Sequence, residues 1–230
     1  MRQTDVADTG WCVWITGLPG SGKSVVSAAL LTLLCERGAE AQLLSSDGLR
    51  RVMTPEPTYS LEERDTVYAT LVHIAALLIN NCVNVIIDAT GNLRRYRDEA
   101  RRQIPRFIEA YLECSINVCM EREQKRKMTH QAPRKIYARA LESNASTVPG
   151  VGQPYESPLS PEIVLDTANC SPRACAEKIL EKIMQSEEAR RSSDKKSFEK
   201  TKAHMRSLVF IRCVAFNQLT NQTEGGNTNS

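Results

Sequence analysis

Residues 17–24 read GLPGSGKS, the G-x-x-x-x-G-K-[ST] pattern of a phosphate-binding loop. A glycine-rich turn of this kind aims consecutive backbone N–H groups at one point, and the helix that follows adds the positive end of its dipole. Lys23 can reach the terminal phosphates of a bound nucleotide, and the Ser24 hydroxyl can hold Mg²⁺. We therefore expect a nucleoside triphosphate to bind here. The residues of this loop are Gly17, Leu18, Pro19, Gly20, Ser21, Gly22, Lys23 and Ser24.

The elements around the loop favour the same interpretation. An apolar strand is expected over Trp11–Thr16 and an apolar helix over Val25–Leu34. Ser60-x-x-Glu63 is a capping box that opens a helix running to about Asn80, and Ser171-Pro172 opens another over 173–184. Further strands are expected over Gln42–Ser46, Val83–Asp88, Phe107–Glu113 and Ile163–Asp166.

Strands that alternate with helices predict a mostly parallel sheet covered on both faces. The expected fold class is α/β, a three-layer sandwich like that of P-loop nucleotide kinases, with about five strands and a mobile lid. In such sheets ligands bind beyond the carboxyl ends of the strands. Because the loop, Asp47 and Asp88 all follow strand ends, we expect them to meet in one cleft.

The two aspartates are the candidate catalytic carboxylates, together with the cation Lys23. Asp88 ends the apolar strand Val85-Ile86-Ile87, as a Walker B aspartate does, and can orient Mg²⁺ or its waters. Its alternative role is to cap the following turn. Residues 88–91 also match the D-x-x-G of GTPases, but the sequence has no N-K-x-D guanine motif. Asp47 is placed to face an acceptor hydroxyl, and its alternative is a turn residue in Ser-Asp-Gly.

Basic residues gather in two places. Five arginines lie in the segment after Asp88, and a second group lies between the fourth and fifth strands, before the Gly/Pro-rich segment 148–158. The second group is typical of a lid that closes over a phosphoryl group and excludes water. For any one arginine a solvated helix face remains the alternative. The groups are Arg94, Arg95, Arg97, Arg101 and Arg102, and Arg122, Lys125, Arg126, Lys127, Arg134, Lys135 and Arg139.

Composition limits the class of protein. With 41% hydrophobic residues the 230-residue chain can form a core, and a net charge of +3 is too mild for a nucleic-acid binder. The eight cysteines form no C-x-x-C pair, so buried free thiols are expected before metal ligands or disulfides. The chain has neither a signal peptide nor a stretch of the roughly 20 apolar residues that spans a bilayer, which predicts a cytoplasmic protein without membrane contact. We expect one domain over 1–185 and a disordered tail over 186–230.

Six stretches of the chain resemble the adenylylsulfate kinase (APS kinase) family of P-loop kinases. The most specific is PGVGQPYESPLSPEIVLDT at 149–167, and the resemblance covers roughly residues 10–185. The other matching stretches are GLPGSGKS (17–24), LLSSDGLR (43–50), YSLEERD (59–65), RRYRDEARR (94–102) and FIEAYLECSINVCMERE (107–123).

The resemblance implies transfer of the ATP γ-phosphate to the 3′-hydroxyl of adenosine 5′-phosphosulfate (APS) with Mg²⁺, in sulfate activation. It also raises a homodimer and functional coupling to ATP sulfurylase as expectations. By position, Asp47 lies near the acceptor hydroxyl. The expectation that Ser24 and Asp88 hold the metal comes from the phosphate-loop and strand-end patterns, because much of the family has a neutral residue where this chain has Asp88. The residues implied at the acceptor are Asp47, Arg50, Tyr59, Arg64, Lys135, Val148, Gly150 and Tyr155.

The chain departs from the family at several positions. Tyr59 and Val148 stand where the family often has two phenylalanines that enclose the substrate adenine, and Asn92 aligns with a serine once assigned as a phosphorylated intermediate. Transfer is therefore expected to be direct. A related P-loop kinase acting on another small hydroxyl compound is the alternative, supported by these differences and by the arginine-rich segment after Asp88. A non-catalytic nucleotide sensor is a weaker alternative, since Lys23 and both aspartates are present.

Overall fold

The computed structural model describes residues 9–54, 56–126, 136–142 and 147–193. Residues 9–183 belong to one compact unit, and residues 184–193 belong to a second. The first unit is built on a five-stranded sheet in the order β2-β3-β1-β4-β7, in which every neighbouring pair is parallel. The strands are β1 (Cys12–Thr16), β2 (Gln42–Ser45), β3 (Val85–Asp88), β4 (Phe107–Glu113) and β7 (Ile163–Asp166).

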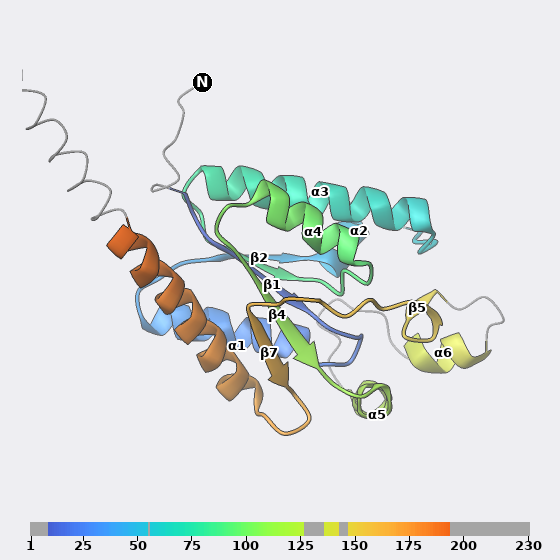
Figure 1. Cartoon of the computed structure of the whole chain (residues 1–230). Coiled ribbons are helices and arrows are strands. Elements are labelled where there is room, and N and C mark those ends of the chain that lie inside the picture. The colour runs from blue at the N-terminus through green and yellow to red at the C-terminus, as the bar shows by residue number, and fades with distance from the viewer. Residues whose placement is uncertain (1–8, 55, 127–135, 143–146, 194–230) are drawn as a thin grey trace, which may run out of the picture. The chain divides into compact units, whose positions relative to one another are not determined.

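Helices cover both faces of this sheet, which confirms the three-layer α/β fold (Figure 1). Side chains of β1 alternate between the two faces, so Val13 packs into one core and Trp14 into the other. The first core also contains residues of α1 and of the helical segment 172–183, and the second contains residues of α3 and α4. The labelled helices are α1 (Lys23–Glu36), α2 (Ser46–Met53), α3 (Leu61–Asn80), α4 (Arg94–Gln103), α5 (Ile116–Lys125) and α6 (Ile136–Glu142).

The segment after β2 differs from the prediction. The strand ends at Ser45 and α2 begins at once, so Asp47 lies in the first turn of a helix rather than in an open turn. Ser45 is the N-cap of α2, and its hydroxyl accepts a hydrogen bond from the Gly48 N–H at 3.4 Å. A side chain of this type stabilises the start of a helix because it satisfies a free N–H of the first turn.

Two short strands between α6 and β7 were not expected. β5 (Val148–Pro149) pairs with β6 (Gly152–Gln153), and Gly150 bridges them with φ 89°. The expected lid falls partly on residues 127–135 and 143–146, which lie outside the described residues, as do Lys135 and Arg134. Of the expected lid and the Gly/Pro-rich segment after it, the two-stranded sheet accounts only for residues 148–153.

The last helix is longer than expected. A helix was predicted to end at Met184 and residues 186–230 to be disordered, but residues 184–193 are helical. Arg190 and Glu187 form an i,i+3 ion pair in this part at 4.0 Å, of the kind that supports exposed helices. The prediction of disorder is therefore wrong for 186–193, and residues 194–230 lie outside the described part.

Two further expectations from the sequence concern the cysteines and membrane-spanning helices, and both are considered for the described residues. All seven cysteines there are free thiols. Cys12, Cys119 and Cys175 are buried as expected, whereas Cys35 and Cys82 are exposed. No helix in the described ranges is long and apolar enough to cross a membrane.

Candidate active site

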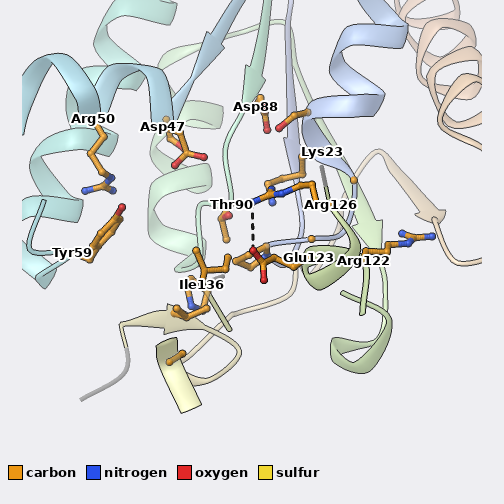
Figure 2. A pocket seen from close by; sticks show the side chains of 18 of the residues that line it. Lys23, Asp47, Arg50, Tyr59, Asp88, Thr90, Arg122, Glu123, Arg126 and Ile136 are labelled. Atoms are coloured by element: carbon orange, nitrogen blue, oxygen red, sulfur yellow. Dashed lines mark ion pairs between the residues drawn. The ribbon is translucent and has the colours of Figure 1, made fainter. Parts of the chain in front are cut away.

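A pocket of about 630 Å³ opens at the carboxyl ends of the central strands. Its walls come from the phosphate loop, α2, the start of α3, the end of β3, α5, α6 and the segment 147–149. Lys23, Asp47 and Asp88 all line it, and Figure 2 shows their side chains around one space. The convergence expected from the strand ends is therefore confirmed.

The phosphate loop presents part of its length to this pocket. Pro19, Gly20, Gly22, Lys23 and Ser24 line it, whereas Gly17, Leu18 and Ser21 do not. Gly20 passes so close to α5 that a Cβ atom would stand 2.5 Å from the carbonyl oxygen of Cys119. A side chain at this position would therefore displace either the loop or the helix.

Lys23 reaches back over the loop that precedes it. Its Nζ donates to the carbonyl oxygens of Gly17 and Leu18, both at 3.0 Å. Burial lowers the pKa of Lys23, and the negative charges of Asp88 and Asp47 act in the opposite direction. The two carboxylates thus favour the charged lysine at the position where phosphate oxygens would replace the carbonyl acceptors.

The two carboxylates reach the pocket from different elements. Asp88 is the last residue of β3, pairs in register with Ile15 and Ser45, and is 7% exposed. Asp47 projects from α2, on the side of the pocket next to Arg50 (Figure 2). The sequence placed both residues at strand ends, and the structure adds that a helix, rather than a turn, orients Asp47.

One wall of the pocket consists of two arginines and a tyrosine. The guanidinium carbon of Arg50 lies 4.8 Å from the ring centroid of Tyr59, and that of Arg64 lies 6.0 Å from it. Both arginines are only 6% exposed. Burial is also the main cause that lowers the pKa of Arg64. Val148 lines the same pocket from β5, so cationic, aromatic and aliphatic groups share one space.

Some residues implied at the acceptor lie behind the pocket. The Tyr155 hydroxyl is 3.1 Å from the Thr16 hydroxyl and its ring stacks on Tyr111, so it supports the end of β1 without lining the pocket. Gly150 packs against Leu18, where a Cβ atom would stand 2.9 Å from a side-chain carbon. Asn92 is buried, and its amide donates to the Pro154 carbonyl oxygen at 3.1 Å.

Two arginines of α4 pair with glutamates of other parts of the fold. Arg97 is 1% exposed and donates to Glu109 at 2.6 Å, and Arg101 pairs with Glu162 at 2.5 Å. None of the α4 arginines lines the pocket. The arginine-rich segment therefore does not support the alternative of a kinase that acts on a different acceptor, because its arginines lie outside the pocket.

Several residues of the pocket wall were not singled out from the sequence. Tyr68, buried in α3, accepts a hydrogen bond from Gly91 N–H at 3.0 Å. Glu123 is buried at the end of α5, with Arg126 at 3.7 Å (Figure 2). Arg122, which the sequence grouped with the lid cations, lines the pocket and also donates to the Thr167 carbonyl oxygen at 2.6 Å, beyond the end of β7. Neither Tyr68 nor Glu123 carried a local signal that separated it from an ordinary helix residue.

A phosphate loop, two carboxylates and an arginine-lined wall at one edge of a parallel sheet define a P-loop kinase. The model of the adenylylsulphate kinase family matches residues 9–166. The chain belongs to this family.

Two relatives illustrate the similarity. A "Probable adenylyl-sulfate kinase" from Archaeoglobus fulgidus is 34% identical over 155 residues, which cover 67% of this chain and 94% of that protein. A "Probable bifunctional SAT/APS kinase 2" from Sorangium cellulosum is 33% identical over 175 residues, covering 76% of this chain but only 29% of that longer protein. The chain thus corresponds to nearly the whole of the first relative and to less than a third of the second.

The solved structures agree with the family. The Mycobacterium tuberculosis APS kinase, determined in complex with AMPPNP and APS, is 28% identical and superimposes with a TM-score of 0.67. The match covers 76% of this chain and 98% of that one. The matched part of the chain therefore has the fold of that APS kinase.

Proposed function

We propose that this chain transfers the γ-phosphoryl group of ATP to the 3′-hydroxyl of APS. The bond between the γ-phosphorus and the β–γ bridging oxygen breaks, a bond to the 3′-oxygen forms, and the 3′-hydroxyl proton leaves. The products are 3′-phosphoadenosine 5′-phosphosulfate (PAPS) and ADP. One observation carries the proposal: in a chain of this family, Lys23, Asp47 and the wall formed by Arg50, Tyr59 and Arg64 line a single pocket.

In this proposal the phosphate loop holds the triphosphate and Lys23 stabilises the charge that develops on the transferred group. Lys23 exchanges its bonds to the Gly17 and Leu18 carbonyl oxygens for bonds to phosphate oxygens. Asp47 accepts the proton of the attacking hydroxyl. Asn92 is already engaged by Arg64 and Pro154, which favours direct transfer without a phosphorylated residue.

Mg²⁺ is part of the proposal, with Ser24 and Asp88 as the protein groups that would hold it. The described residues contain no cluster of three or more acidic, histidine or cysteine side chains suited to a metal ion. One hydroxyl, from Ser24, and one carboxylate, from Asp88, fit Mg²⁺, which is usually bound by one or two carboxylates together with substrate phosphates and water. When bound at Ser24 and Asp88, the ion would neutralise negative charge on the phosphate groups.

The acceptor wall fits a nucleotide that carries an anion. Arg50 and Arg64 offer charged donors for the phosphosulfate, and Tyr59 offers a ring face for the adenine. In this proposal Val148, which lines the same pocket, covers the second face of the adenine with an aliphatic surface. In this proposal the aliphatic side weakens adenine stacking but leaves recognition of the anion intact.

The test is an assay of ADP release with Mg-ATP and a panel of acceptors: APS, nucleosides and sugar acids. We expect release that depends on APS and formation of PAPS, identified by mass spectrometry. Release with another acceptor and none with APS would replace this function by that of a related kinase. Nucleotide binding without turnover of any acceptor would favour a sensor.

Two further expectations belong to the proposal. A homodimer is expected, and native mass spectrometry would measure it. Functional coupling to ATP sulfurylase is supported by the bifunctional name of the Sorangium cellulosum relative, because an enzyme that joins sulfate to a nucleotide must supply APS. A cytoplasmic location stays a prediction from the sequence.

A further inference from the structure

Glu63, in the first turn of α3, uses both of its carboxylate oxygens outside that helix. Oε2 accepts hydrogen bonds from the Thr58 N–H at 2.6 Å, the Thr58 hydroxyl at 2.7 Å and the Tyr59 N–H at 3.0 Å. Oε1 pairs with the guanidinium of Arg50 on α2. The sequence assigned Glu63 only to a capping box with Ser60. The Ser60 hydroxyl does accept from the Glu63 N–H at 3.2 Å, but the carboxylate serves the loop before the helix and the neighbouring helix.

Tyr59 is held in a conformation that it would not adopt freely. Its φ is 56°, in the left-handed region that side chains other than glycine rarely occupy. Glu63 binds its N–H at 3.0 Å, and the Nε of Arg64 donates to its carbonyl oxygen at 3.1 Å. A strained residue of this kind persists only where its surroundings fix it from several sides. The strain therefore points to a function for the position of the Tyr59 ring.

Arg50 is fixed by the same carboxylate. An arginine side chain has many rotamers, and ordering it before a ligand binds removes an entropy cost from binding. The side chains of Arg50 and Glu63 are 7% and 9% exposed, so this is a largely buried pair. Burial would raise the pKa of Glu63, but the hydrogen bonds from Thr58 and Tyr59 and the charge of Arg50 hold it below its usual value. The carboxylate is thus ionised whenever the protein is at neutral pH.

We propose that Glu63 is a positioning residue for the acceptor side of the pocket, because one carboxylate fixes both the Arg50 guanidinium and the Tyr59 ring. Glu63 does not itself line the pocket, whereas Arg50, Tyr59 and Arg64 do. Its removal releases the long arginine and lets the Tyr59 backbone relax to negative φ, which turns the ring away from its place. The identity of the acceptor in this inference rests on the proposed function. The role of Glu63 in fixing Arg50 and Tyr59 is independent of which acceptor binds.

The first measurement is steady-state kinetics of Glu63→Gln. Glutamine has nearly the same size as glutamate and keeps one oxygen acceptor, but it loses the negative charge. We expect the KM for APS to rise about tenfold or more, the range of a lost charge-assisted hydrogen bond, and the KM for ATP to stay within about twofold, since the phosphate loop is untouched. Glu62→Gln is the matched control, because Glu62 is the exposed neighbour in the same helical turn.

The second measurement does not depend on turnover. Labelling with phenylglyoxal, which reacts with accessible guanidinium groups, is followed by peptide mass spectrometry. Arg50 is buried and should label slowly in the wild type and in Glu62→Gln, but several times faster in Glu63→Gln. The adjacent Arg51 is exposed in the wild type and serves as the internal reference.

Equal labelling of Arg50 in Glu63→Gln and Glu62→Gln, with an unchanged KM for APS, would overturn the proposal. Loss of ATP binding in Glu63→Gln would overturn it as well, because Glu63 would then support the whole domain. If the wild type does not phosphorylate APS at all, the proposed function fails, while faster labelling of Arg50 would still establish that Glu63 positions this side chain.

Discussion

Arg64→Ala tests both the acceptor site and the packing around it. Arg64 donates to the Tyr59 carbonyl oxygen at 3.1 Å, to Asn92 at 3.5 Å and to the carbonyl oxygen of Thr147, 83 residues away in sequence. Counting the two backbone contacts at the lower value of about 1.5 kcal/mol for a charge-assisted hydrogen bond gives a loss of about 3 kcal/mol in the free energy of unfolding. For a domain of this size the melting temperature should fall by about 6–12 °C.

Substrate recognition should change in parallel. If Arg64 binds the phosphosulfate, a lost charge-assisted bond raises the KM for APS by about 10- to 150-fold. The KM for ATP should change much less, because Arg64 stands on the acceptor wall and not on the phosphate loop. Thermal unfolding followed by circular dichroism gives the first quantity, and initial rates of ADP release at 25 °C, below the melting range, give the second.

A surface arginine provides the control. Arg95, on α4, is 54% exposed at its side chain and pairs with Asp65, so Arg95→Ala should cost at most about 1 kcal/mol and leave both KM values unchanged. The reasoning is refuted if Arg64→Ala melts within a degree of the wild type. A rise in the KM for ATP equal to that for APS would instead show that Arg64 supports the pocket in general and does not recognise the acceptor.

Four other predictions follow from the site. Lys23→Ala should lower kcat by about 10²–10³ with the fold intact, and activity above a tenth of wild type would remove Lys23 from the mechanism. Burial lowers the pKa of Lys23, and the charge of Asp88 opposes this effect more than any other charge does. Asp88→Asn should therefore lower the pKa of Lys23 and move the alkaline limb of the pH–rate profile to lower pH, by more than Asp47→Asn does. A shift of that limb to higher pH would contradict this reasoning. Val148→Phe should preserve or lower the KM for APS, since aromatic pairs add about 0.5–1.5 kcal/mol beyond area burial, and a rise would show that the adenine does not lie there. Deleting residues 194–230 should leave kcat and both KM values near wild type, and an insoluble or inactive product would show that the domain needs this segment.

Local patterns in the sequence were sufficient for the framework of the fold. The bounds of β4 and β7 agree with the prediction because short segments rich in apolar residues predict strands without reference to the rest of the chain. The phosphate loop is equally local, since its backbone geometry depends on glycines at fixed spacings within eight residues. Strand ends in a parallel sheet share one edge, so the order of strands and helices along the chain was enough to place Asp47 and Asp88 beside the loop.

Contacts between distant residues decided the rest, and no periodicity encodes them. Tyr155 matches the family motif, yet its hydroxyl lies against Thr16, 139 residues earlier, and not in the pocket. The arginines of α4 resemble a cationic surface in the sequence, but in the fold Arg97 and Arg101 pair with Glu109 and Glu162.

Glu63 shows the same division within one residue. Its spacing from Ser60 predicts a helix cap, because capping depends on residues three positions apart. Its pairing with Arg50 depends on how α2 and α3 pack together, which only the tertiary structure fixes. The sequence alone therefore determined the nucleotide-binding framework and the chemical groups available, whereas packing determined which of those groups line the pocket and which hold them in place.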